Sequence, residues 1–261
     1  MKTILETMSV AFSMFSALPV PHCVWSEKNM RFALCAFPLV GAVIGAVWWF
    51  WCAVCALAPV GDVLRGAGLC LLPVLLTGGI HLDGYADVCD ALASCAAPEQ
   101  KQAILKDPRC GAFAVIRLCT YFAASFALCV ALTPAAPALW ALGLGFVFSR
   151  ALSGFAVCRF PLAKDTGLAH TFSVAADRRC AGCALLLFAA ATGGAMAALG
   201  GLLGVIAAAV GLLAFWRYRV VALAQFGGIS GDLAGWFVQR AELWMLFAAV
   251  AVQLAERTVL G

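Results

Sequence analysis

The sequence predicts an all-α, polytopic integral membrane protein with about seven membrane-spanning helices. Its mean hydropathy is +1.00, and only 11% of its 261 residues are charged. Apolar runs of about 20 residues, long enough for a helix to cross a bilayer, recur along the chain. The regular alternation of apolar and polar residues that a membrane β-barrel needs is absent. We therefore expect residues 1–261 to form a single integral membrane domain.

Seven apolar segments match this fold class, and turn residues or charges bound each of them. The segments are 33–58, 67–81, 111–132, 138–157, 181–199, 203–222 and 241–259. An amphipathic or half-buried helix is expected before them at 3–18. Polar or glycine-rich loops are expected at 59–66, 82–110, 158–180 and 225–235.

The basic residues predict the orientation, because cytoplasmic loops of membrane proteins carry an excess of Lys and Arg. With seven spans and a cytoplasmic N-terminus, only Arg65 and Arg257 of the 17 basic residues fall on the far side. The loops 82–110, 158–180 and 225–235 then share the cytoplasmic face, where they can form one site. The net charge of +4 follows from this orientation. No basic stripe interleaved with aromatic residues indicates nucleic-acid binding.

The strongest chemical signal is the acidic run DGYADVCD. On a helix with about 100° per residue, Asp83, Asp87 and Asp90 fall within roughly 60° of one another. The run contains no basic residue to offset their repulsion. A divalent cation would offset it, and Mg²⁺ and Mn²⁺ both prefer oxygen ligands. The alternatives are a solvated acidic face, or carboxylates favoured by the helix dipole.

Two further motifs suit a phosphorylated ligand. The segment LKDPRCG places Lys106 and Arg109 beside an acid, a grouping that can neutralise phosphate oxygens but is also common at cytoplasmic loop ends. The segment GGISGD, residues 227–232, has glycines whose N–H groups can bind an anion, or which serve only in helix packing. Its Asp232 can add a carboxylate to the metal ligands.

Two isolated polar residues complete the candidate set. Arg150 lies near the cytoplasmic end of the predicted fourth span, where an ionisable residue is a functional candidate or a snorkelling interfacial side chain. His81 comes two residues before Asp83, but helical geometry points it away from the acidic face. An irregular backbone at this point would let it reach a substrate.

The stretch HLDGYADVCDAL resembles the signature of the cobalamin synthase family, whose members are adenosylcobinamide-GDP ribazoletransferases. Further segments resemble other parts of that family in the same order. They are FSALPVP at 15–21, PLVGAVIG at 38–45, LKDPRCGAF at 105–113, FSRAL at 148–152 and GGISGDLAG at 227–235. The resemblance implies a multi-pass transferase of vitamin B12 biosynthesis in the bacterial inner membrane. It would join adenosylcobinamide-GDP to α-ribazole or its 5′-phosphate and release GMP.

The resemblance and the motifs together assign expected roles. The expected metal ligands for Mg²⁺, with Mn²⁺ also suitable, are Asp83, Asp87, Asp90 and Asp232. The expected catalytic residues are Asp90, as the acceptor of the hydroxyl proton, with Lys106 and Arg109 on the diphosphate. The expected substrate-binding residues are His81, Arg150, Gly227, Gly228 and Gly231. The partners are the two substrates and the lipid bilayer, without nucleic acid, and a homo-oligomer is compatible with the sequence.

The sequence leaves two other functions open. A CDP-alcohol-type lipid phosphotransferase performs the same kind of reaction, but its motif has an arginine that DGYADVCDA lacks and later paired aspartates. A divalent-cation transporter would use the acids as a permeation site. That function requires carboxylates in the middle of a span, accessible from both faces.

Overall fold

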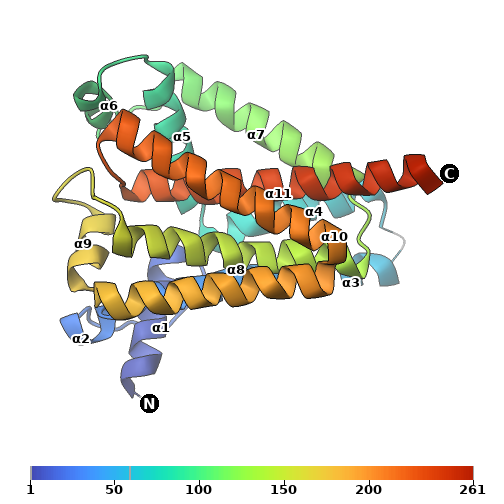
Figure 1. Ribbon diagram of the computed structural model, residues 1–261, viewed down its shortest axis with the longest axis horizontal. Coiled ribbons are helices and arrows are strands. Elements are labelled where there is room, and N and C mark those ends of the chain that lie inside the picture. Colours follow the sequence, from blue (N-terminus) through green and yellow to red (C-terminus); the bar gives the residue numbers. More distant parts are fainter. Residues whose placement is uncertain (1, 59, 261) are drawn as a thin grey trace.

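The structure, a computed structural model, describes residues 2–58 and 60–260 and is all-helical over that range (Figure 1). The helices are α1 (Lys2–Phe15), α2 (Glu27–Met30), α3 (Ala33–Leu57), α4 (Asp62–Thr77), α5 (Ile80–Ala93), α6 (Pro98–Ile104), α7 (Ala112–Ala131), α8 (Ala136–Arg159), α9 (Leu168–Ala175), α10 (Arg178–Phe226) and α11 (Gly231–Leu260). The predicted fold class is confirmed. Met1, Pro59 and Gly261, which the predicted domain 1–261 includes, lie outside the described residues.

The long helices correspond to the predicted spans. Within the described residues, α3, α7, α8, α10 and α11 are each long and apolar enough to cross a membrane, and the bent pair α4–α5 is a sixth candidate. Helix α10 contains two arms, because Gly201 in its middle has φ 56° and ψ −140°. A Cβ at Gly204 would lie 1.8 Å from the Met196 carbonyl oxygen. This tight hairpin therefore needs glycine, and its arms match the predicted spans 181–199 and 203–222.

Helix α8 is the centre of the bundle and is buried along most of its length by α3, α10 and α11. Glycines allow α3 to approach it closely. A Cβ at Gly41 would lie 2.2 Å from the Phe146 carbonyl oxygen, and one at Gly45 would lie 2.5 Å from that of Gly143. Such small residues let helix backbones meet in a membrane, where van der Waals packing drives helix association.

Two predicted loop boundaries are wrong. The expected loop 59–66 is mostly the first turn of α4, where Asp62 and Arg65 form an ion pair at 2.5 Å. Arg65 also donates to the Leu132 carbonyl at 3.1 Å, so its charge does not interrupt the helix. The glycine-rich loop expected at 225–235 ends at Ser230. The Ser230 hydroxyl accepts the Leu233 N–H at 3.2 Å, which starts α11 at Gly231.

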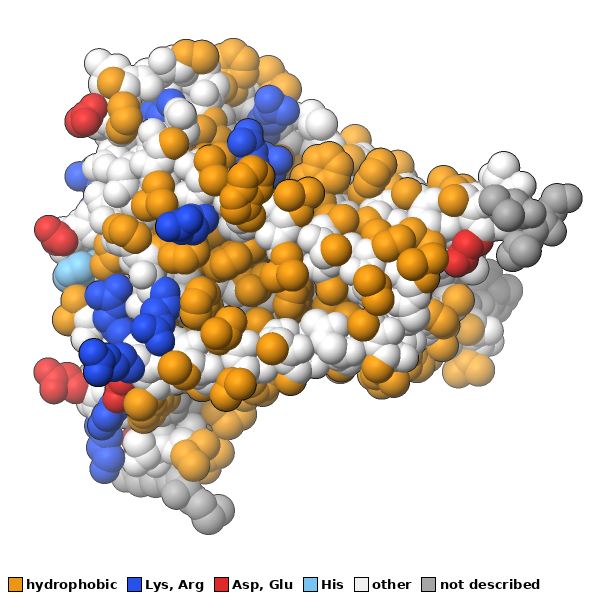
Figure 2. Space-filling view, viewed as in Figure 1, with side chains coloured by type: hydrophobic (Ala, Val, Ile, Leu, Met, Phe, Trp, Pro, Cys, Tyr) orange, Lys and Arg blue, Asp and Glu red, His pale blue; other side chains and the backbone are white. Residues whose placement is uncertain are grey.

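The acidic segment does not continue in a straight line from the second predicted span, 67–81. Gly78 and Gly79 have φ 64° and 79°, and this pair turns α5 by 95° relative to α4. Helix α5 therefore lies across the end of the bundle and does not follow the axis of α4. At the same end lie α2, α6 and α9, and Lys and Arg side chains gather there (Figures 1 and 2). The remainder of the visible surface is mainly hydrophobic.

Candidate active site

The acidic helix α5 crosses the beginning of α11 at very short range. A Cβ at Gly84 would lie 2.7 Å from the Asp232 carbonyl oxygen, and one at Gly235 would lie 3.0 Å from the His81 carbonyl oxygen. Each helix therefore presents a glycine where it meets the backbone of the other. This crossing brings Asp83 and Asp87 of α5 beside Asp232 in the first turn of α11.

Beside this crossing, hydrogen bonds join the loop before α11 to the loop after α8. Ile229 donates its N–H to the Pro161 carbonyl and accepts from the Ala163 N–H, both at 2.8 Å. The Gln102 side chain of α6 donates to the Phe226 carbonyl at 2.8 Å and to the Ala163 carbonyl at 3.2 Å. These bonds hold the segment after α8 in place. Lys164, which follows directly, lies with its Nζ 3.7 Å from Asp232 Oδ2.

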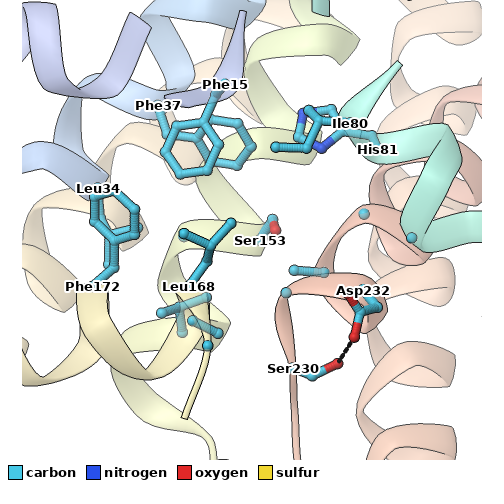
Figure 3. Close-up of a pocket in the computed structure, with 18 of the residues that line it drawn as sticks. Phe15, Leu34, Phe37, Ile80, His81, Ser153, Leu168, Phe172, Ser230 and Asp232 are labelled. Carbon is cyan, nitrogen blue, oxygen red and sulfur yellow. Dashed lines mark hydrogen bonds between the residues drawn. The ribbon is translucent and has the colours of Figure 1, made fainter. Parts of the chain in front are cut away.

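A cavity of about 220 Å³ opens between these elements (Figure 3). Its lining includes Phe15, Phe37 and Phe172 on one side, with Leu34 and Leu168 beside them. The other side carries His81, Ser230 and Asp232 in the close-up, and Asp83 and Lys164 also line the cavity. The cavity therefore combines an apolar wall with a charged wall.

The charged wall is rich in uncompensated negative charge. Partial burial, together with the charges of Asp83, Asp232 and Asp90 and against the effect of Lys164, raises the pKa of Asp87 to about 6. Asp87 is therefore close to all three acids that were predicted with it. One lysine cannot neutralise four carboxylates, so the site favours a cation or a cation-bound ligand.

The predicted metal ligands do not all face the cavity. Asp83 and Asp232 line it and Asp87 lies next to them, but Asp90 turns toward the beginning of α7. Its carboxylate accepts the Ala114 N–H at 3.3 Å. Among the described residues, no three His, Cys, Asp or Glu side chains converge closely enough to enclose an ion. Carboxylates at helical spacing start about 5–6 Å apart at Cβ, so side-chain rotation is needed to bring them together.

The predicted diphosphate cations, Lys106 and Arg109, lie outside the cavity in the loop before α7. Arg109 is exposed and forms a 2.6 Å ion pair with Asp107. Hydrogen bonds from Arg109 lower the pKa of Asp107 to about 2. The cation that reaches the cavity is instead Lys164, which sequence reasoning did not select. Its charge within the loop 158–180 was the available signal, but no helical spacing connects it with the acids.

Arg150 does not line the cavity, although the sequence placed it among the substrate-binding residues. It is fully buried and pairs with Glu242 at 2.6 Å. It also donates to the Phe146 carbonyl at 2.9 Å, and the Ser149 hydroxyl donates to Glu242 at 2.8 Å. Sequence reasoning missed Glu242, although an acid at the beginning of the predicted span 241–259 was a detectable signal.

His81 lines the cavity from a regular helix, without the irregular backbone that the sequence argument required. It is 5% exposed, and its Nε2 has no hydrogen-bond partner among the described residues. Burial and the charge of Arg150 lower the pKa of His81 to about 3. His81 is therefore neutral at physiological pH, with one buried ring nitrogen that the described residues leave unpaired.

The glycines of GGISGD have separate functions. Gly227, with φ 73°, ends α10. Gly228 donates its N–H to the Ala222 carbonyl at 3.1 Å, and a Cβ on it would lie 2.5 Å from the Leu162 backbone. The N–H groups of Gly228 and Ile229 are thus engaged within the protein and do not form an open anion nest. Of these glycines, only Gly231 lines the cavity.

The comparisons with known proteins agree with the sequence motifs. The family model described as "Cobalamin-5-phosphate synthase" matches residues 7–250. The chain belongs to this family. It is similar to an adenosylcobinamide-GDP ribazoletransferase of Lachnoclostridium phytofermentans, with 41% identity over 98% of this chain and 96% of the relative. A protein of the same name from Clostridium botulinum is 28% identical over 95% of this chain and 98% of that relative. No solved structure matches the chain.

The cavity lies within the part of the chain that matches the cobalamin-5-phosphate synthase family. The matched region contains all the elements that form the cavity, from Phe15 of α1 to the first turns of α11. The acids of the HLDGYADVCDAL signature and Asp232 of GGISGDLAG are distant in the sequence and adjacent in the fold. The highly specific acidic signature and the glycine-rich motif therefore meet at one site.

Proposed function

We propose that this protein joins adenosylcobinamide-GDP to α-ribazole or its 5′-phosphate, producing adenosylcobalamin or its 5′-phosphate and GMP. We place the reaction at the cytoplasmic face of a bacterial inner membrane, with the N-terminus cytoplasmic. The observation that carries the proposal is the meeting of Asp83, Asp87 and Asp232 with Lys164 at one cavity in a chain of this family.

The chemistry is a phosphoryl transfer. A ribose hydroxyl of the ribazole attacks the phosphorus on the cobinamide side of the diphosphate, the bond to the GMP oxygen breaks, and the hydroxyl proton passes to a carboxylate. Such reactions depend mainly on positioning and on electrostatic stabilisation of the transferring group. Lys164 supplies a positive charge beside the acids, and the neutral His81 lies on the same side of the cavity.

The acids fit Mg²⁺ by their chemistry, because they are oxygen ligands with little positive charge around them. We propose Asp83, Asp87 and Asp232 as ligands, with Asp90 adjacent to them. When bound, the ion supplies charge neutralisation to the diphosphate oxygens. Mn²⁺ suits the same ligands. Asp90 as the proton acceptor remains a prediction, and its contact with the α7 N-terminus holds its carboxylate in a fixed position.

The size of the cavity indicates which part of the substrate it accepts. Pockets for drug-sized ligands measure about 300–1,000 Å³, so a cavity of about 220 Å³ holds the diphosphate and an adjoining sugar rather than a whole corrinoid. The corrinoid would then lie over the exposed end of the bundle. Lys106 and Arg109 are exposed at this end and are suited to contact the part of the substrate outside the cavity.

The test is GMP release by membranes that contain the protein and receive both substrates. We expect release to require Mg²⁺ or Mn²⁺ and to stop with EDTA. For substitutions of the cavity aspartates, Asp165→Asn serves as a matched control, because Asp165 is exposed in the same loop as Lys164 but does not line the cavity. Full GMP release after complete metal removal would contradict the metal proposal, and absence of GMP under every condition would contradict the reaction.

The position of the acids bears on the cation-transport alternative. Asp83 and Asp87 lie on α5, which crosses the end of the bundle after the 95° bend, and not in the middle of a span. This position supports chemistry at the membrane face rather than permeation. Uptake of labelled metal by sealed vesicles distinguishes the two functions.

A further inference from the structure

A second cavity lies on the side of the bundle, between the second arm of α10 and α11. It measures about 440 Å³ and is mostly apolar. Its lining residues are Val210, Leu213, Ala214, Arg217, Trp236, Phe237, Arg240, Trp244, Phe247 and Ala248. None of them lines the candidate active site. We call this cavity the lateral groove.

The lateral groove carries positive charge that the protein does not compensate. Arg217 and Arg240 both line it, and the charge of Arg117 on α7 also acts on Arg240. Within the part of the chain that the structure describes, none of the three arginines forms an ion pair with an acid. The guanidinium of Arg240 lies 4.7 Å from the centre of the Trp236 ring, which fixes its orientation.

The arginines lie at the depth of a lipid headgroup. Helix α11 has 30 residues, or about 45 Å at 1.5 Å per residue, and therefore exceeds a hydrocarbon core of about 30 Å by about 15 Å. Arg240 is about 14 Å along the axis from the first residue of α11. With the excess length of α11 assigned to the charged end of the bundle, Arg240 lies near the boundary between hydrocarbon and headgroups. Arg217 is equally far from the end of α10, so the two charges share one level.

The rest of the lateral groove suits an acyl chain. Leu213, Trp244 and Phe247 are 60%, 45% and 50% exposed, and all three line it. Both helices continue from the arginines toward the middle of the bundle, so apolar side chains follow the charged level. Figure 2 shows Lys and Arg side chains set back from the charged end and surrounded by hydrophobic surface.

We propose that the lateral groove binds an anionic phospholipid, whose phosphate contacts Arg217 and Arg240 and whose acyl chain lies along Leu213 and Phe247. Charge complementarity selects this occupant. A zwitterionic lipid carries its own cation, whereas an anionic headgroup neutralises the clustered arginines. Bidentate contacts between guanidinium and phosphate are among the stronger charge-assisted hydrogen bonds. The bound lipid would stabilise the contact between α10 and α11, the helix that carries Asp232.

The test measures lipid retention and stability in the full-length protein. The protein is reconstituted with phosphatidylcholine containing a minority of phosphatidylglycerol, extracted into a mild detergent, and examined by native mass spectrometry. Thermal unfolding is followed with and without added phosphatidylglycerol. We expect selective retention of phosphatidylglycerol and a rise in the unfolding temperature. In Arg217→Gln/Arg240→Gln we expect about 30-fold weaker retention, the factor that corresponds to about 1 kcal/mol for each charge.

Matched variants keep the result interpretable. Arg179→Gln/Arg219→Gln removes two exposed charges outside the lateral groove, and we expect normal retention. Arg217→Lys/Arg240→Lys keeps the charge and should retain most of the binding, which separates charge loss from misfolding. Equal retention of phosphatidylglycerol and phosphatidylcholine, equal loss in the control variant, stabilisation by inorganic phosphate alone, or a dimer that closes the lateral groove would each overturn the proposal.

Discussion

Two acids of helix α11, Asp232 and Glu242, lie about 15 Å apart along its axis, and their surroundings are opposite. Asp232 lies at a solvent-accessible cavity beside Asp83 and Asp87, with Lys164 at 3.7 Å. Glu242 is buried inside the bundle, with Arg150 at 2.6 Å and the Ser149 hydroxyl at 2.8 Å. The outer acid has excess negative charge around it, and the inner acid is paired within the protein.

The different surroundings indicate different roles: Asp232 is placed to bind a ligand, and Glu242 is placed to stabilise the bundle. A charge that the protein already pairs has little left to offer a ligand, and it holds two helices together inside the membrane. A charge left among like charges destabilises the empty site and is available to a cation or to a cation-bound diphosphate. Asp232 and Glu242 should therefore respond differently to substitution.

The largest expected effect is on the inner pair. Glu242→Leu leaves Arg150 buried without its partner, and removal of one member of a buried pair costs about 3–5 kcal/mol. We expect a large fall in the unfolding temperature of the detergent-solubilised protein. The double variant Arg150→Met/Glu242→Leu should recover most of this loss, because no unpaired charge remains. A double variant as unstable as the single one would show that the pair is not the cause.

The next largest effect is on the outer acids. Asp83→Asn and Asp232→Asn should each lower GMP release by about 10²–10³-fold, as for the loss of one preorganised electrostatic group. Their unfolding temperature should stay equal or rise, because repulsion with Asp87 decreases. The measurement combines GMP release by membranes with thermal unfolding of the same preparation. Unfolding as severe as in Glu242→Leu would remove the distinction between the two acids.

A third prediction concerns the crossing that creates the outer cluster. Gly84→Ala places a Cβ against the Asp232 backbone, at 2.7 Å before any relaxation. Such overpacking costs about 1–3 kcal/mol and should separate the acids of α5 from Asp232. We expect lower stability together with a higher metal concentration for half-maximal GMP release. Gly194→Ala in α10, where a Cβ meets nothing within 4 Å, is the control.

The smallest effect is expected at the cation of the cavity. Lys164→Gln should lower GMP release about tenfold, in the range for loss of one hydrogen bond to a charged group. Arg109→Gln should have a smaller effect, because Asp107 engages that guanidinium. Comparison of the two variants in one membrane assay locates the diphosphate. A larger loss for Arg109→Gln would place it outside the cavity.

Much of the fold follows from composition, because a segment of about 20 apolar residues has few alternatives to a spanning helix. The predicted segment 111–132 differs from α7 by one residue at each end, and 33–58 differs from α3 only by one residue at its end. The predicted boundaries were wrong where the local sequence signal was ambiguous. Gly231 and Gly235 suggested a loop but begin α11, because the Ser230 cap and the contact of Gly235 with His81 favour a helix.

By itself, the sequence determined the class of protein, the order of the spans, the acidic helix and the family, since hydrophobicity and local spacing are properties of contiguous residues. Only the tertiary structure decided which charged residues meet. The bend at Gly78–Gly79, the approach of Gly84 to Asp232 and the pairing of Arg150 with Glu242 join residues far apart in the chain. A residue's local pattern carries no record of its distant neighbours, and for that reason the partners of Lys164 and Glu242 became visible only in the fold.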